Sequence, residues 1–163
     1  MLKFIRLFKH YFLGISFIGI AAFVVQEIPY IIMPLIDPSP NPIMNMPEGI
    51  KWLEIAQSIF GVLSMILLML IVRDDVKVFS ISTPKEKLFF SLTLGTIAVN
   101  FTGWAFYYTG YQYGWLMVLT QFAAVPLYYL FYGLWKKNYL LAAAALPFLV
   151  IHTVNGYINL ISI

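Results

Sequence analysis

The chain has 163 residues, of which 61% are hydrophobic and 10% are charged, and its mean hydropathy is +0.85. Soluble domains carry about a quarter charged residues and about half apolar ones, so this composition excludes a water-soluble globular protein and predicts an integral membrane protein. The formal net charge is +3, but the basic residues are spread along the chain, so nucleic acid is not an expected partner. There is no cysteine, which excludes disulfides and thiolate ligands.

Five apolar runs are each long enough to cross a bilayer, whose hydrocarbon core of about 30 Å needs roughly 20 residues of helix. Short polar or proline-rich segments separate these runs. We therefore predict an all-α integral membrane fold, in which residues 1–163 form a single domain of five transmembrane helices. The predicted helices cover residues 11–36, 50–72, 88–108, 114–134 and 139–161.

The positions of Lys and Arg predict the orientation of the bundle. Nine of these ten residues precede the first helix or lie in the connections between helices two and three and between helices four and five. Only Lys51 lies on the other side. Because the cytoplasmic loops of membrane proteins carry an excess of Lys and Arg, we expect a multi-pass protein of the inner (plasma) membrane with a cytoplasmic N-terminus and an external C-terminus.

The external segment 37–49 joins the first two predicted helices. It contains four prolines, which disfavour helix and stiffen the chain. Its Met and Ile side chains would gain nothing from exposure to water, so we predict a lid packed over the helix ends. A plain spacer is the alternative.

Polar side chains lie at a similar depth in all five predicted helices, close to their external ends. Such residues are costly in a membrane and usually face the bundle interior or a wet cavity. We therefore predict a small-molecule pocket in the outer half, with apolar and aromatic walls and a few polar groups. The candidates from this pattern are Trp52, Gln57, Asn100, Trp104, Gln121, His152 and Asn155. The alternative for each amide is a hydrogen bond that only joins neighbouring helices.

Four residues in the later helices stand in a register that resembles the TspO/MBR family, the translocator proteins also called tryptophan-rich sensory proteins. They are Asn100, Gly114, Pro147 and Asn159. The chain lacks the tryptophan-rich loop of that family. The helix-five tryptophan of the family falls at Ile151 here, which the resemblance places in the pocket, and Asn155 stands where the family has a small residue.

The resemblance implies a TspO-like bundle in membrane lipid, often a homodimer, whose first loop covers a pocket for a flat hydrophobic molecule such as a tetrapyrrole or a sterol-like lipid. It implies no required cofactor; the bound molecule would be of porphyrin or haem type. Aromatic side chains would hold such a ligand and amides would orient it. The aromatic residues are Trp52, Phe60, Trp104 and Phe106, and the amides are those of Asn100, Gln121 and Asn155.

Two other functions stay open at this point. An intramembrane enzyme acting on a sterol-like or lipid substrate could use Glu27, Glu54 and His152 as acid and base. A small transporter or accessory subunit would need no pocket at all. We find no metal-ligand spacing and assign no catalytic residue, so a ligand-binding sensor or transporter is the preferred prediction.

Overall fold

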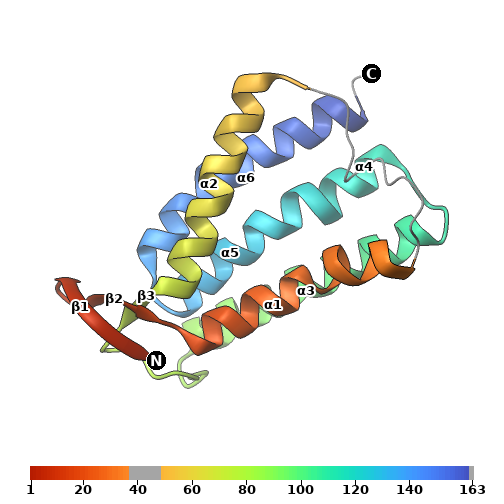
Figure 1. Cartoon of the computed structure of the whole chain (residues 1–163). Coiled ribbons are helices and arrows are strands. Elements are labelled where there is room, and N and C mark those ends of the chain that lie inside the picture. Colours follow the sequence, from red (N-terminus) through yellow and green to blue (C-terminus); the bar gives the residue numbers. More distant parts are fainter. Residues whose placement is uncertain (37–48, 162–163) are drawn as a thin grey trace.

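The computed structural model describes residues 1–36 and 49–161 of the chain. Apolar helices form a bundle, and a small antiparallel sheet lies at one end of it (Figure 1). The helices are α1 (Phe17–Ile36), α2 (Lys51–Leu70), α3 (Pro84–Tyr108), α4 (Gly114–Met117), the π-helical η1 (Val118–Ala123), α5 (Ala124–Trp135) and α6 (Tyr139–Leu160). The strands are β1 (Leu2–Phe8), β2 (Tyr11–Ile15) and β3 (Ile71–Arg73). The predicted lid, residues 37–49, lies outside the described residues apart from Gly49.

Four helical stretches are long and apolar enough to span a membrane. They are α2, α3, the continuous stretch from α4 through η1 to α5, and α6. The chain is therefore a mostly helical protein whose helices suit a membrane, as its composition predicts. The apolar part of α1 over Phe17–Ile32 is shorter, so the count of five spans and the orientation stay predictions.

The central helix of the bundle is α5, which packs against α3 on one side and α6 on the other (Figure 1). Its aromatic side chains make up much of the core. Tyr129 is fully buried, and Trp135 and Phe148 of α6 are each 5% exposed. Leu68 of α2 joins the same cluster. Burial of large aromatic surfaces stabilises the centre of the bundle and fixes the position of α5.

The helices α1 and α3 begin at side-chain caps, as does α6 at Asn138. The Ser16 hydroxyl accepts a hydrogen bond from the backbone N–H of Gly19 (3.1 Å), so α1 begins at residue 17. The Thr83 hydroxyl accepts from the N–H of Glu86 (3.2 Å), and the Glu86 carboxylate accepts from the N–H of Thr83 (3.2 Å). This reciprocal capping box starts α3 at residue 84, four residues before the predicted start.

The prediction of an uninterrupted helix over residues 11–36 is wrong at its N-terminal end. Residues 11–15 form β2, which pairs antiparallel with β1 on one side and β3 on the other. Tyr11, Phe12 and Ile15 are aromatic or β-branched residues, which favour strands. Gly14 permits close pairing, because a Cβ atom there would collide with the carbonyl oxygen of Leu2. The second predicted helix is also shorter, since β3 begins at Ile71.

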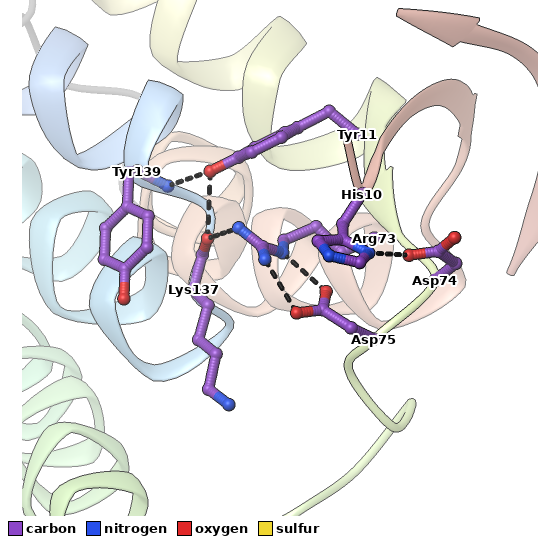
Figure 2. A network of polar contacts seen from close by, with 7 residues as sticks. All are labelled: His10, Tyr11, Arg73, Asp74, Asp75, Lys137 and Tyr139. Atoms are coloured by element: carbon purple, nitrogen blue, oxygen red, sulfur yellow. Dashed lines mark hydrogen bonds and ion pairs between the residues drawn. The ribbon is translucent and has the colours of Figure 1, made fainter. Parts of the chain in front are cut away.

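A polar network fixes the sheet to the turn between α5 and α6 (Figure 2). The Tyr11 hydroxyl donates to the carbonyl of Lys137 (3.1 Å) and accepts from the N–H of Tyr139 (3.1 Å). The Arg73 guanidinium donates to the same Lys137 carbonyl (2.9 Å) and forms two bonds to the Asp75 carboxylate (2.8 and 2.7 Å). Arg73 thereby lowers the pKa of the Asp75 carboxyl, and Asp75 raises the pKa of Arg73.

The two residues directly before Lys137, which are Trp135 and Lys136, hold the connection between β3 and α3. The Lys136 Nζ atom donates to the carbonyls of Lys77 (2.7 Å) and Val78 (2.8 Å), and the Trp135 indole N–H donates to the carbonyl of Ser80 (2.7 Å). Lys136 is only 8% exposed. Its burial lowers the pKa of the ammonium to about 8.

The stability of the wild-type protein should rise relative to that of Lys136→Met as the pH increases from about 8 to about 10.4. Within this window the unfolded chain holds a proton on Lys136 that the folded chain has released, so a higher pH favours folding. Thermal denaturation of both proteins in detergent across this range measures the difference. A difference that is constant with pH would show that burial does not lower the pKa of the Lys136 amine in the folded state.

Candidate functional site

A cavity of about 270 Å³ lies between α1, α2, α5 and α6. We call it the α1–α2 cavity, because these two helices form its walls while α5 and α6 form its floor. Figure 1 shows α1 and α2 diverging from the sheet end of the bundle, with α5 behind the gap between them. The polar residues that line the cavity are Gln26, Glu27, Tyr30, Gln57, Ser58 and His152.

The α1 wall carries an amide and a carboxylate side by side. Gln26 is 3% exposed, and its side-chain oxygen accepts a hydrogen bond from the hydroxyl of Tyr129 (3.0 Å). The neighbouring Glu27 forms no hydrogen bond or ion pair with any described residue. An ionisable side chain that faces a cavity from an apolar helix is a candidate functional group. The Glu27 carboxylate is therefore an unpaired charged group of this cavity among the described residues.

The α2 wall is held by a chain of amides that continues onto α6. Asn155, which is 2% exposed, donates to the side-chain oxygen of Gln57 (2.9 Å). Asn159 in turn donates to the side-chain oxygen of Asn155 (3.0 Å). These bonds fix the orientation of Gln57, whose amide N–H₂ group makes no hydrogen bond with another described residue.

His152 brings an imidazole to the floor of the cavity. Its ring stacks on Phe148 (5.0 Å between centroids, 24° between planes) and lies beside Phe122 (4.8 Å). The Nδ1 atom is buried and has no hydrogen-bond partner among the described residues. Buried polar atoms in native structures are usually paired, so this ring has hydrogen-bonding capacity that its neighbours do not use.

A second polar cluster lies beside the cavity, between α1, α3 and η1. Asn100 donates to the carbonyl of Thr120 (2.9 Å) and to the side-chain oxygen of Gln121 (2.9 Å). The hydroxyl of Tyr30 donates to the same oxygen of Gln121 (3.3 Å). Tyr30 also lines the cavity, so it links the two groups of polar residues.

The structure divides the ten predicted ligand-binding residues into three sets. Gln57 and His152 line the cavity, and Asn155 supports Gln57 from behind. Asn100, Gln121 and Trp104 form the neighbouring cluster; Trp104 is 1% exposed and packs edge-on against Tyr30 at 5.0 Å. The other four lie outside both groups. Trp52 is 67% exposed, Phe106 is 43% exposed, Phe60 packs against the aromatic core, and Ile151 is half-buried away from the cavity.

Only two of the three acid–base candidates lie in the same cavity. Glu27 and His152 line the cavity. Glu54 instead accepts a hydrogen bond from the backbone N–H of Gly49 (2.8 Å), close to the start of α2. This arrangement gives the cavity one carboxylate and one imidazole.

The sequence pattern did not single out Tyr30 and Tyr129, two of the aromatic residues in the cavity. A signal for Tyr30 is present in the sequence, because it follows Gln26 and Glu27 by four and three residues and therefore shares their face of the helix. Tyr129 carries no such signal, since it is one of several tyrosines that suit an interfacial belt equally well.

One group of side chains outside the cavity has the composition of a metal site. His10, Asp74 and Asp75 place their ligand atoms within 4.8 Å of one another, and all three are exposed. His10 is paired with Asp74 (2.9 Å), and the Asp75 carboxylate is held by Arg73 (Figure 2). The adjacent guanidinium would repel a cation, so we assign no metal to this group.

Comparison with protein-family models, with curated proteins and with solved structures finds no match for this chain. The resemblance to the TspO/MBR family therefore stays a prediction. The geometry of the α1–α2 cavity is the evidence on which a function can be argued.

Proposed function

We propose that this protein binds a small, mainly apolar molecule carrying one polar group, and holds it in the α1–α2 cavity as a membrane sensor or transporter. The observation that carries the proposal is the convergence of Glu27, Gln57 and His152 from three helices on one cavity. Ligand sites in proteins typically combine apolar walls with a few polar groups that fix the orientation of the ligand. Phe148 and Tyr129 supply aromatic surface on the floor.

The size of the cavity bears on the class of ligand. Its volume of about 270 Å³ lies just below the range of about 300–1,000 Å³ found for drug-sized ligands. A tetrapyrrole is larger than most such ligands. The volume therefore favours a smaller aromatic or alicyclic molecule over the porphyrin-type ligand that the family resemblance implies.

An intramembrane enzyme is the second candidate, because Glu27 and His152 lie in the same cavity. A carboxylate and an imidazole can act as acid and base only if both reach the same substrate atoms. To bind a ligand without turning it over, Glu27 and His152 need only form hydrogen bonds with it, and they can contact different atoms of the ligand. We place binding first because it makes the smaller demand on the geometry of these two residues.

Indole, a planar apolar ring with a single N–H donor, should raise the melting temperature of the detergent-solubilised wild-type protein. Glu27→Gln should weaken indole binding by about tenfold or more, because a hydrogen bond to a charged acceptor contributes about 1.5–3 kcal/mol. Gly61→Leu should abolish the response, since residue 61 lines the cavity and a leucine side chain there would fill it.

Gly95→Leu is the matched control, because a Cβ atom at residue 95 meets nothing within 4 Å. This variant should keep the full response to indole. Equal responses in wild type and Gly61→Leu would show that indole binds elsewhere. Stabilisation by protoporphyrin IX but not by indole would contradict the size argument and support the tetrapyrrole prediction.

A further inference from the structure

The β1–β2 hairpin lies at the level where the apolar helices of the bundle end. Helix α2 ends at Leu70 and passes directly into β3, and a single residue separates the end of β2 at Ile15 from the start of α1 at Phe17. Figure 1 shows β1 as the outermost strand at that end, beyond the helices. In a membrane, the end of an apolar helix marks the boundary between the acyl chains and the lipid headgroups. The hairpin is therefore at the height of the membrane surface.

Two irregularities in the pairing of β1 sort its side chains onto separate faces. The paired residues are Leu2 with Ile15, Lys3 with Gly14, Ile5 with Leu13, Arg6 with Phe12 and Phe8 with Tyr11, with register shifts that leave Phe4 and Leu7 unpaired. Directly paired residues of an antiparallel sheet point to the same face. Since β2 alternates, Leu2, Ile5 and Phe8 share one face, and Lys3 and Arg6 share the other.

Side-chain contacts agree with this assignment. The Phe8 ring stacks on Tyr11 at 4.7 Å, whereas Lys3 and Arg6 both lie over the ring of Phe12, at 5.4 and 6.0 Å. A regular strand would mix these residues, because even-numbered and odd-numbered positions would alternate. The register shifts thus make an amphipathic hairpin from a sequence that does not alternate.

The apolar face is open over most of β1. Ile5 is 60% exposed, Leu2 is 48% exposed and Phe8 is 47% exposed, and the unpaired Phe4 is 61% exposed. Contiguous exposed apolar surface of this kind marks a site of contact with a protein or a membrane.

The basic residues at the sheet end of the bundle indicate which kind of surface the hairpin contacts. Nine of the ten Lys and Arg residues are in the hairpin, in β3 and its connection to α3, in the first turn of α3, or in the turn between α5 and α6. These segments all lie at the sheet end of the bundle. The acidic Asp74, Asp75 and Glu86 at the same end are each engaged, by His10, Arg73 and the cap of α3 respectively. The net positive charge favours an anionic surface.

We propose that the β1–β2 hairpin is a membrane-surface anchor for an anionic leaflet. Its apolar face, with Leu2, Ile5 and Phe8, lies in the boundary between headgroups and acyl chains. Lys3 and Arg6 stay within the Debye length of about 10 Å from the lipid phosphates. A second copy of the chain pairing along β1 is disfavoured, since bulges and an edge Lys are features that block strand addition.

The test uses nitroxide labels on single cysteines, which is direct because the chain has none of its own. Labels replace Leu2, Ile5 and Phe8 on one face and Lys3 and Arg6 on the other, in the full-length protein reconstituted in nanodiscs of phosphatidylcholine with phosphatidylglycerol. We expect collision with oxygen, which concentrates in lipid, at positions 2, 5 and 8. Collision with a water-soluble nickel chelate should dominate at positions 3 and 6.

The anionic lipid should matter as well. Omitting phosphatidylglycerol should reduce the lipid-embedded fraction of the label at position 5. In the Lys3→Gln, Arg6→Gln double variant, the preference of the hairpin for membranes with phosphatidylglycerol over membranes without it should fall by about fivefold for each cation removed. Lys51→Gln, at the opposite end of α2, is the control and should change nothing. Nickel access at positions 2, 5 and 8 in both lipids would overturn the proposal, and so would dipolar broadening between labels of two copies. Indole binding in the α1–α2 cavity is measured separately and does not depend on this result.

Discussion

Gly19→Ala should destabilise the protein by about 1–3 kcal/mol, whereas the same substitution at Gly95 should stabilise it by up to about 1 kcal/mol. A Cβ atom at residue 19 would collide with the backbone carbonyl oxygen of Leu68 on α2. Backbone cannot move aside as a flexible side chain can, so α1 and α2 would have to separate. At Gly95 the added methyl group meets nothing within 4 Å, and only the gain in helix propensity remains.

The position of Gly19 connects this prediction to the cavity. α1 and α2 are in close contact at Gly19 and Leu68, and the two helices diverge from the sheet end of the bundle to form the two walls (Figure 1). Moving this crossing would displace Glu27 relative to Gln57, so Gly19→Ala should also weaken the response to indole. Denaturation in detergent and indole titration of the two alanine variants measure both effects. Equal stability of Gly19→Ala and Gly95→Ala would show that the helices are not in close contact at this crossing.

The later helices could be predicted from the sequence almost to the residue. The predicted spans 114–134 and 139–161 agree with the observed Gly114–Trp135 and Tyr139–Leu160, because long apolar runs between polar turns leave few alternatives. The π-helical segment η1 was not predicted. Pro126 lies three residues beyond it and has no N–H to donate, which gives a physical reason for irregular hydrogen bonding in this stretch.

The N-terminal sheet could not be predicted from hydropathy. Residues 11–15 continue the apolar run of α1, and hydropathy does not distinguish a buried strand from a helix. Capping signals do distinguish them. Ser16 before the apolar run, and Thr83 with Pro84 and Glu86, are signatures of helix starts and coincide with the observed starts of α1 and α3.

The level of the polar residues along the helices could be predicted from the sequence, but the direction in which each side chain points could be predicted only in part. Helical rise places Gln57, Asn100 and Asn155 near one level, and side-chain packing then decides which cluster each residue joins. Gln57 and Asn155 meet across α2 and α6, while Asn100 turns to Gln121. Trp52 illustrates the same limit, because its place at the start of α2 leaves the ring 67% exposed.

The hydrogen bonds of the Asn100 amide predict a large loss of stability when this residue is changed to an acid. Asn100→Asp should destabilise the protein by about 3–5 kcal/mol, more than Asn100→Leu, which should cost about 1–2 kcal/mol. The Nδ2 group donates to the Thr120 carbonyl and the Gln121 side-chain oxygen, both at 2.9 Å, and more weakly to the Tyr30 hydroxyl at 3.4 Å. A carboxylate would place another acceptor and a charge against them, in a site where residue 100 is 3% exposed.

A leucine at residue 100 also loses the donor but adds no charge, so the comparison separates acceptor repulsion from the simple loss of a hydrogen bond. Gln112→Glu makes the same chemical change at an exposed position and should alter stability by no more than about 0.5 kcal/mol. Unfolding of the three variants in detergent gives the order of stabilities. If Asn100→Asp were as stable as Asn100→Leu, either the buried carboxyl would be protonated, or water or a cation would reach residue 100 and the polar cluster beside Tyr30 would be part of the cavity rather than a dry contact behind it.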